Sequence, residues 1–193
     1  MHSGKRGSTI IEFVLTTSLI YVPLLLGTMV IGLNIIRAIQ VNQVNRDAGH
    51  MFARGVDFSA PSNRAMLLHL ASGLNITDQG GDGVIILSTI LHVGQDECPD
   101  GCANLGYDVI TRRITIGNTG VRESRYGTPA NIDANGNVIN YLNDASARAN
   151  GFSSVMTLQG GDVAYVAESY FDSPDFDIPG FMEDTGVAAH AVF

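Results

Sequence analysis

The uncharged stretch FVLTTSLIYVPLLLGTMVIGLNII, residues 13–36, decides the fold of this chain. A helix rises about 1.5 Å per residue, so this stretch reaches roughly 36 Å, more than the hydrocarbon core of about 30 Å. A secretory signal has a shorter apolar core, about 7 to 15 residues, followed by a small-residue cleavage site. We therefore expect a retained transmembrane helix over about residues 13–36.

The charges beside this stretch indicate its orientation. Lys5 and Arg6 precede it within the short head MHSGKRG. Basic residues favour the cytoplasmic side of a membrane, so we expect a single-pass chain with its N-terminus in the cytoplasm. The remainder, from about residue 37, would then be extracytoplasmic.

Glu12 stands at the start of the apolar run, between Ile11 and Phe13. An ionised carboxylate at membrane depth costs on the order of a few kcal/mol unless it is neutralised or reaches the interface. Two interpretations remain open from the residues alone. Glu12 either lies at headgroup level or requires a cationic partner within the membrane.

The segment KRGSTIIEF, residues 5–13, resembles the class III signal of type IV pilin-like proteins, which has basic residues, a Gly and then an apolar helix with Glu at the fifth position. Together with VPLLLG, residues 22–27, it is similar to the TadE-like pseudopilins of tight-adherence (Flp-type) pilus systems. In those proteins a Pro precedes a Leu run, as Pro23 does here, and in a helix we expect it to introduce a kink.

This resemblance implies a processing and assembly route. A prepilin peptidase would cut after Gly7 and leave Ser8 as the first residue and Glu12 as the fifth. The new α-amino group is a cation at neutral pH, so it could neutralise Glu12 of a neighbouring subunit. The partners implied are the peptidase, other pilin subunits through the N-terminal helix, and the inner membrane during assembly. The product would be an extracytoplasmic or extracellular filament.

Two alternatives share most of these features. One is an uncleaved, single-pass anchor carrying an extracytoplasmic binding domain, with Glu12 at the interface. The other is a pseudopilin of a type II secretion machine. Main-type pilins and secretion pseudopilins usually have Phe at the first mature position, where this chain has Ser8, so the residue favours the TadE-like branch.

The rest of the chain is typical of an α+β domain. We expect a cleaved leader at residues 1–7, an N-terminal helix segment at 8–58 and an extracytoplasmic domain at 59–193. Within the second segment, the helix itself should end near Ala53. Ser59 is the expected N-cap of a short second helix. Runs rich in β-branched and aromatic residues predict strands at 84–93, 107–117 and 162–171. In the second of these we expect a bulge or an edge position. The predicted fold is a long N-terminal helix continuing into a small antiparallel, pilin-like sheet.

Two short motifs suggest local chemistry. Cys98 and Cys102 flank Pro-Asp-Gly, a turn sequence, and extracytoplasmic conditions favour a disulfide between them. Asn131, Asp133 and Asn135 match the first half of a calcium loop of the EF-hand type, but Leu142 occupies the twelfth position, where a bidentate Glu is needed. The Asn-Gly step in the same segment favours a hairpin over a calcium site.

Composition excludes several classes of protein. The 193 residues carry a net charge of −8, the wrong sign for a chain that binds nucleic acid. The five histidines are scattered, and we find no metalloprotease motif, P-loop or dinucleotide-binding motif. We therefore expect a structural protein rather than an enzyme, with no cofactor apart from the weak calcium candidate.

Overall fold

A computed structural model describes residues 5–172 and 186–193, and the side chains from residue 9 onward. Two compact units divide the chain between Arg37 and Ala38, and we describe each by itself. The first helix, α1 (Lys5–Ala53), runs through this division. The fold class is α+β and pilin-like, as the sequence predicts: a long apolar N-terminal helix is followed by a four-stranded antiparallel sheet.

The end of α1 is set by a glycine, close to the predicted position. Gly55 has φ = 84°, the left-handed conformation that glycine adopts without strain. Its amide donates to the carbonyl of Phe52 at 2.9 Å, and the amide of Val56 donates to that of Met51 at 3.0 Å. These two bonds form a Schellman motif, which satisfies carbonyls that the last helical turn leaves without partners.

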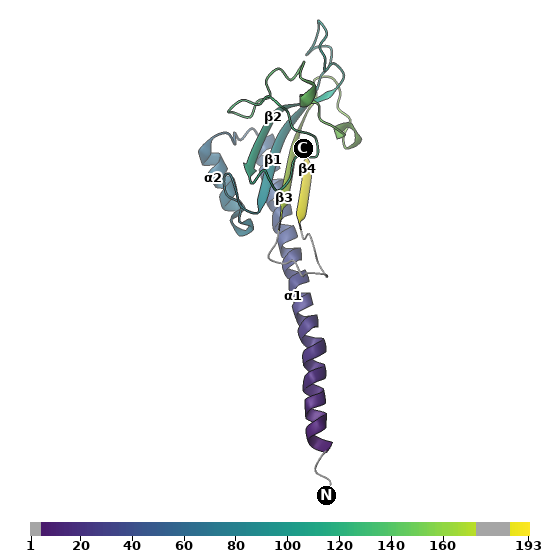
Figure 1. Ribbon diagram of the computed structural model, residues 1–193. Helices are drawn as coiled ribbons and strands as arrows, with labels where there is room; N and C mark the ends of the chain where they lie inside the picture. Colours follow the sequence, from purple (N-terminus) through teal and green to yellow (C-terminus); the bar gives the residue numbers. More distant parts are fainter. Residues whose placement is uncertain (1–4, 173–185) are drawn as a thin grey trace. The chain divides into compact units, whose positions relative to one another are not determined.

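The sheet of the second unit has the strand order β2-β1-β3-β4, and all neighbours are antiparallel. Figure 1 shows β2 at one edge and β4 at the other. The bounds are β1 (Gly83–His92), β2 (Asp108–Gly117), β3 (Val163–Phe171) and β4 (Val187–Val192). The first three agree with the predicted strands to within a residue at each end.

The predicted irregularity lies in β2, which is also an edge strand. Thr89 of β1 pairs with Arg112, but the next residue, Ile90, pairs with Ile110. Thr111 is therefore an extra residue in β2, and the side chains beyond it change faces. Both features predicted for this strand, a bulge and an edge position, are confirmed.

Helices and a long loop cover the two faces of the sheet. One face packs against the C-terminal part of α1 and against α2 (Pro61–Leu70), with Phe52, Phe58 and Leu67 fully or almost fully buried. At Gly49 the backbone of α1 comes so close to β3 that an added Cβ would lie 3.0 Å from that of Ala167. The opposite face is covered by the loop between β2 and β3, which buries Tyr126 and Phe152. The sheet is thus the middle layer of the second unit.

Two local expectations differ from the structure. The N-cap of α2 is Ala60, with Pro61 at the first helical position, while the hydroxyl of Ser59 donates to the carboxylate of Asp57 at 2.8 Å. The strand β4 has the sequence VAAHAV, in which three alanines weaken the strand signal, so it was not among the predicted strands. The acidic segment before it, residues 173–185, lies outside the described residues.

Candidate functional site: an exposed apolar helix and a buried carboxylate

The N-terminal unit presents its apolar side chains to the outside. Phe13 is 71% exposed and Leu19 is 78% exposed, and similar values hold along the helix. The stretch Thr9–Ala53 is long and apolar enough to span a membrane, and none of its most apolar window is buried by the rest of the chain. A monomer in water rarely exposes apolar surface on this scale, so the helix requires lipid or other helices around it. A single-pass membrane anchor is consistent with this surface.

Glu12 is an exposed carboxylate among the apolar residues of this unit. Its backbone carbonyl accepts a hydrogen bond from the hydroxyl of Thr16 at 2.8 Å. Gly7 and Ser8 lie one turn earlier, at the start of α1, and residues four apart occupy the same face of a helix. An amino group created at Ser8 would therefore lie near Glu12 of its own chain, as well as being available to a neighbouring chain.

Pro23 lies inside α1, and the helix continues on both sides of it. Proline has no amide hydrogen to donate, so one turn of the helix lacks a hydrogen bond. The kink predicted there stays a prediction. Nearby, the hydroxyl of Thr28 donates to the carbonyl of Leu25 at 2.9 Å, which removes its need for a polar partner in lipid.

The second unit contains a buried carboxylate that was not among the predicted site residues. Glu168 on β3 is fully buried and accepts three hydrogen bonds. The donors are the hydroxyl of Ser124 at 2.5 Å, the hydroxyl of Tyr170 at 2.9 Å and the amide of Arg125 at 3.1 Å. Because two of the donors belong to the loop after β2, Glu168 fixes that loop against the sheet.

A buried guanidinium shares the same face of the sheet. Arg113 is 6% exposed and donates to the carbonyl of Gly127 at 3.0 Å. Its Nε and one terminal nitrogen have no hydrogen-bond partner, and neither does the hydroxyl of Ser88, its cross-strand neighbour. Burial lowers the pKa of Arg113 to about 10, although the negative charge of Glu168 opposes this effect.

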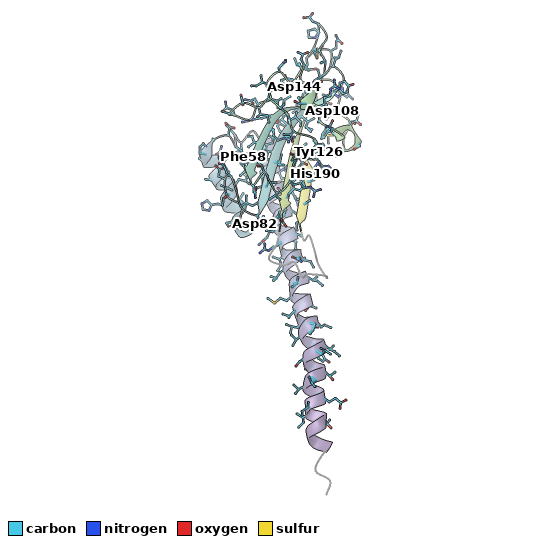
Figure 2. The ribbon with its side chains drawn as sticks, viewed as in Figure 1. Phe58, Asp82, Asp108, Tyr126, Asp144 and His190 are labelled. Atoms are coloured by element: carbon cyan, nitrogen blue, oxygen red, sulfur yellow. A yellow bond between two sulfur atoms is a disulfide. The ribbon has the colours of Figure 1, made fainter. Side chains whose placement is uncertain are left out.

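Two tyrosines connect this cluster to β4. Burial raises the pKa of Tyr170 to about 12, and the charge of Glu168 adds to the rise. The hydroxyl of Tyr126 and Nε2 of His190 are 2.6 Å apart, and Figure 2 labels both residues. Burial lowers the pKa of His190, and the nearby charge of Arg125 lowers it further. Together these contacts form a polar network between β3, β4 and the loop after β2.

The predicted disulfide is present. Cys98 and Cys102 are bonded, with their Cα atoms 6.0 Å apart. Gly101 has φ = 83° and donates its amide to the carbonyl of Cys98 at 3.2 Å, so the Pro-Asp-Gly step forms the turn between the two sulfurs. The bridge closes part of the loop between β1 and β2.

The calcium candidates form a tight turn. Ile132 and Val138 pair as an antiparallel bridge, and the carboxylate of Asp133 accepts hydrogen bonds from the amides of Asn135 and Asn137, each at 2.8 Å. The side chain of Asn131 instead donates to Asp144 at 3.1 Å. The carboxylate of Asp133, which a cation would need as a ligand, thus stabilises the turn by accepting these amide hydrogen bonds. Across residues 5–172 and 186–193, no group of three acidic, His or Cys side chains could hold a metal ion.

The polar network was missed because its members are distant in sequence. Ser124 and Glu168 are 44 residues apart, and a single sequence carries no signal for such a pair. The alternation of β3 does contain a partial signal. One face of this strand carries Val166, Glu168 and Tyr170, and all three are buried. A carboxylate therefore stands in a row of buried side chains.

Comparisons with protein-family models, with curated proteins and with solved structures find no match for this chain. The function is therefore argued from the residues and the geometry described above.

Proposed function

We propose that the chain is a pilin-like structural subunit, similar to the TadE-like pseudopilins of tight-adherence pili. A prepilin peptidase would remove residues 1–7, and the subunit would then assemble with other pilin subunits through α1. The observation that carries this proposal is the exposed apolar helix with Glu12 at the fifth position after Gly7, joined in one chain to an antiparallel sheet domain.

The physical argument concerns the cost of placing Glu12 in an apolar environment. An uncompensated carboxylate in lipid is unfavourable, and a cation at the new N-terminus relieves the penalty. Pairing with the amine of a neighbour is possible only in one helical register. Pairing within the same chain would also relieve the penalty, but it would give no assembly specificity. The proposal requires the contact between chains.

The chain before assembly would span the inner membrane once, with residues 1–7 in the cytoplasm and the sheet domain outside. The leader contributes Lys5 and Arg6, so the mature chain is more acidic than its precursor. The rival function is an uncleaved anchor for an extracytoplasmic binding domain. The exposed position of Glu12 at the start of the apolar run fits a headgroup-level residue equally well, so cleavage separates the two functions.

The first experiment determines the N-terminus of the natively expressed chain by intact mass and terminal sequencing. We expect it to start at Ser8 in cells with a prepilin peptidase and at Met1 in cells without one. A Gly7→Leu variant should stay unprocessed in both. A wild-type chain that keeps Met1 in the presence of an active peptidase would favour the uncleaved anchor.

The second experiment tests assembly. A Glu12→Ala variant should be expressed and processed but should not enter a pilus fraction sheared from cells. Asp47→Ala is the matched control, because Asp47 is another exposed carboxylate on α1. Normal incorporation of the Glu12→Ala subunit would refute its role in assembly. A type II secretion pseudopilin would give the same results in both experiments, but it would assemble with secretion subunits instead of pilus subunits. Identification of the co-purifying subunits distinguishes these two functions.

A further inference from the structure

The two edges of the sheet differ in how their backbone groups are satisfied. The free edge of β2 is covered by the loop that follows it: the amides of Val138 and Ala149 donate to carbonyls of β2 at 2.9 and 2.8 Å, and the amide of Arg113 donates to Gly136 at 2.7 Å. This edge cannot accept another strand without displacing that loop.

The edge at β4 has no such cover within residues 5–172 and 186–193. Tyr165 and Phe193 exchange two backbone hydrogen bonds, of 2.9 and 2.8 Å, which fixes the alternation along the β3–β4 ladder. In an antiparallel ladder, every second residue directs its N–H and C=O away from the partner strand. In β4 these residues are Ala188, His190 and Val192.

The sequence of β4 has none of the usual features that prevent strand pairing. Edge strands are commonly protected by Lys, Pro, an inward charge or a bulge. VAAHAV contains no proline and no acidic or basic residue other than His190, and it pairs with β3 in continuous register. An open edge of this kind is a template for an incoming strand.

Two arginines stand beside this edge. Arg122 lies over the ring of Tyr170, with its guanidinium carbon 5.1 Å from the ring centroid, and Arg125 lies over Tyr126 at 5.6 Å. Both are exposed, and no described carboxylate lies within 4 Å of either guanidinium. Together with His190 they line a shallow pocket on the face of β4. Glu168 holds the loop that carries them, because it accepts hydrogen bonds from the hydroxyl of Ser124 and from the amide of Arg125.

We propose that β4 binds an extended, acidic peptide segment of another protein by strand addition. The backbone of the segment would pair with Ala188, His190 and Val192, and its carboxylates would lie against Arg122 and Arg125. Charge complementarity selects this occupant, because neither arginine forms an ion pair with a described carboxylate, although the chain has a net charge of −8. The proposal concerns the sheet domain alone, so it does not depend on processing or on Glu12.

A second copy of the chain is a poorer occupant on the same grounds. Antiparallel pairing of β4 with β4 across a two-fold axis keeps the same faces on the same side. It would therefore bring the arginine pairs of both copies together, and like charges disfavour this arrangement. The covered edge of β2 is not available for head-to-tail pairing.

The test uses the full chain in detergent and two fluorescent seven-residue peptides, in which Val alternates with Asp or with Lys. Anisotropy should show the Asp peptide binding at least tenfold more tightly than the Lys peptide. Hydrogen exchange should show new protection at the amides of Ala188, His190 and Val192. Absence of binding by the Asp peptide, or equal binding of both peptides, overturns the proposal.

Variants separate strand addition from simple attraction to an anion. Ala188→Pro removes an outward N–H without removing a bond to β3, so it should abolish binding, whereas Ala188→Val should retain it. Arg122→Gln with Arg125→Gln should weaken binding at least tenfold, while Arg54→Gln, another exposed arginine, should not.

Circular dichroism confirms that each variant is folded before its affinity is used. Binding that survives Ala188→Pro but is competed by inorganic phosphate would identify an anion site and overturn strand addition. Light scattering tests whether a second copy of the chain occupies the edge of β4. A dimer that Ala188→Pro dissociates would assign the edge to a second copy and would equally overturn the proposal.

Discussion

Glu168 shows how one buried carboxylate can determine the position of a whole loop. It has no exposed surface, and three donors surround it, two of them from the loop after β2. Buried charges are tolerated only when they are hydrogen-bonded, and here two of the bonds also hold the loop that carries Arg122 and Arg125. The residue thus links the interior of the sheet domain to the surface beside β4.

Replacing Glu168 by Ala should destabilise the sheet domain strongly. The change leaves the hydroxyls of Ser124 and Tyr170 without an acceptor and removes the negative charge near buried Arg113, so we expect a loss of about 3–5 kcal/mol. Chemical denaturation in detergent measures it. The control is Glu123→Ala, which removes an exposed carboxylate from the loop after β2. It should change the free energy of unfolding by no more than about 0.5 kcal/mol. Equal effects of the two substitutions would show that Glu168 does not anchor the loop.

His190 should make stability fall at mildly acidic pH. Burial lowers the pKa of its imidazole, Arg125 lowers it further, and Glu168 opposes them. Below the unfolded pKa of about 6.5, the unfolded chain binds a proton that the folded chain disfavours, so the contribution is complete above that pH and is lost as the pH falls. The pKa values of Asp57, Asp133 and Asp144 are also lowered, from 3.8, so their contributions are lost only at more acidic pH.

The measurement is the melting temperature of the wild type and of His190→Gln between pH 7.5 and pH 5. The wild type should lose more stability over this range than the variant. His69→Gln is the control, because His69 is exposed and lies on α2. Parallel curves for the wild type and His190→Gln would contradict this account of the titration.

Among the elements, the loop closed by Cys98 and Cys102 tests how much a small covalent ring contributes. The ring spans five residues, and the loop-entropy relation gives about 2 kcal/mol for a ring of that size. Replacing both cysteines by serine should lower the free energy of unfolding by about this amount. Reduction of the wild type should have the same effect. A variant as stable as the oxidised wild type would indicate that the turn at Gly101 suffices.

The elements differ in how well the sequence could predict them. The apolar run at 13–36 and the β-branched strands β1 to β3 follow from local patterns, and Gly55 marks the helix end. The strand β4 could not be found, because an alanine-rich segment becomes a strand only through its pairing with β3. Likewise Ser59 is a good N-cap by type, but its hydroxyl binds Asp57, and Ala60 takes the cap position.

The candidate site divides in the same manner. Gly7, Ser8, Glu12, Cys98 and Cys102 stand in short contiguous motifs, so a single sequence could propose them. The network around Glu168 and the arginines beside β4 depend on contacts between segments more than 40 residues apart. No local pattern encodes those contacts, so they had to be found in the folded chain.

For the whole molecule, the division between Arg37 and Ala38 separates two kinds of stability. Residues 9–37 of the N-terminal unit bury almost no side chain within the chain and require lipid or partner helices. The buried apolar clusters of the sheet domain all lie in the second unit, from Val41 onward. These clusters include no residue of the first unit. The second unit therefore contains the whole of its described apolar core and should fold without a membrane.

A chain that starts at Ala38 should therefore be a folded, soluble protein without detergent. It keeps Val41, Val44, Ala48 and Phe52, the residues of α1 that are buried against the sheet, and it loses only the exposed apolar helix. We expect its melting temperature to match that of the full chain in detergent, because the same core unfolds in both. A chain starting at Arg54 is the control and should fail to fold, because it lacks one covering layer of the sheet. Aggregation of the Ala38 chain in buffer would mean that the stability of the sheet domain depends on residues before Ala38.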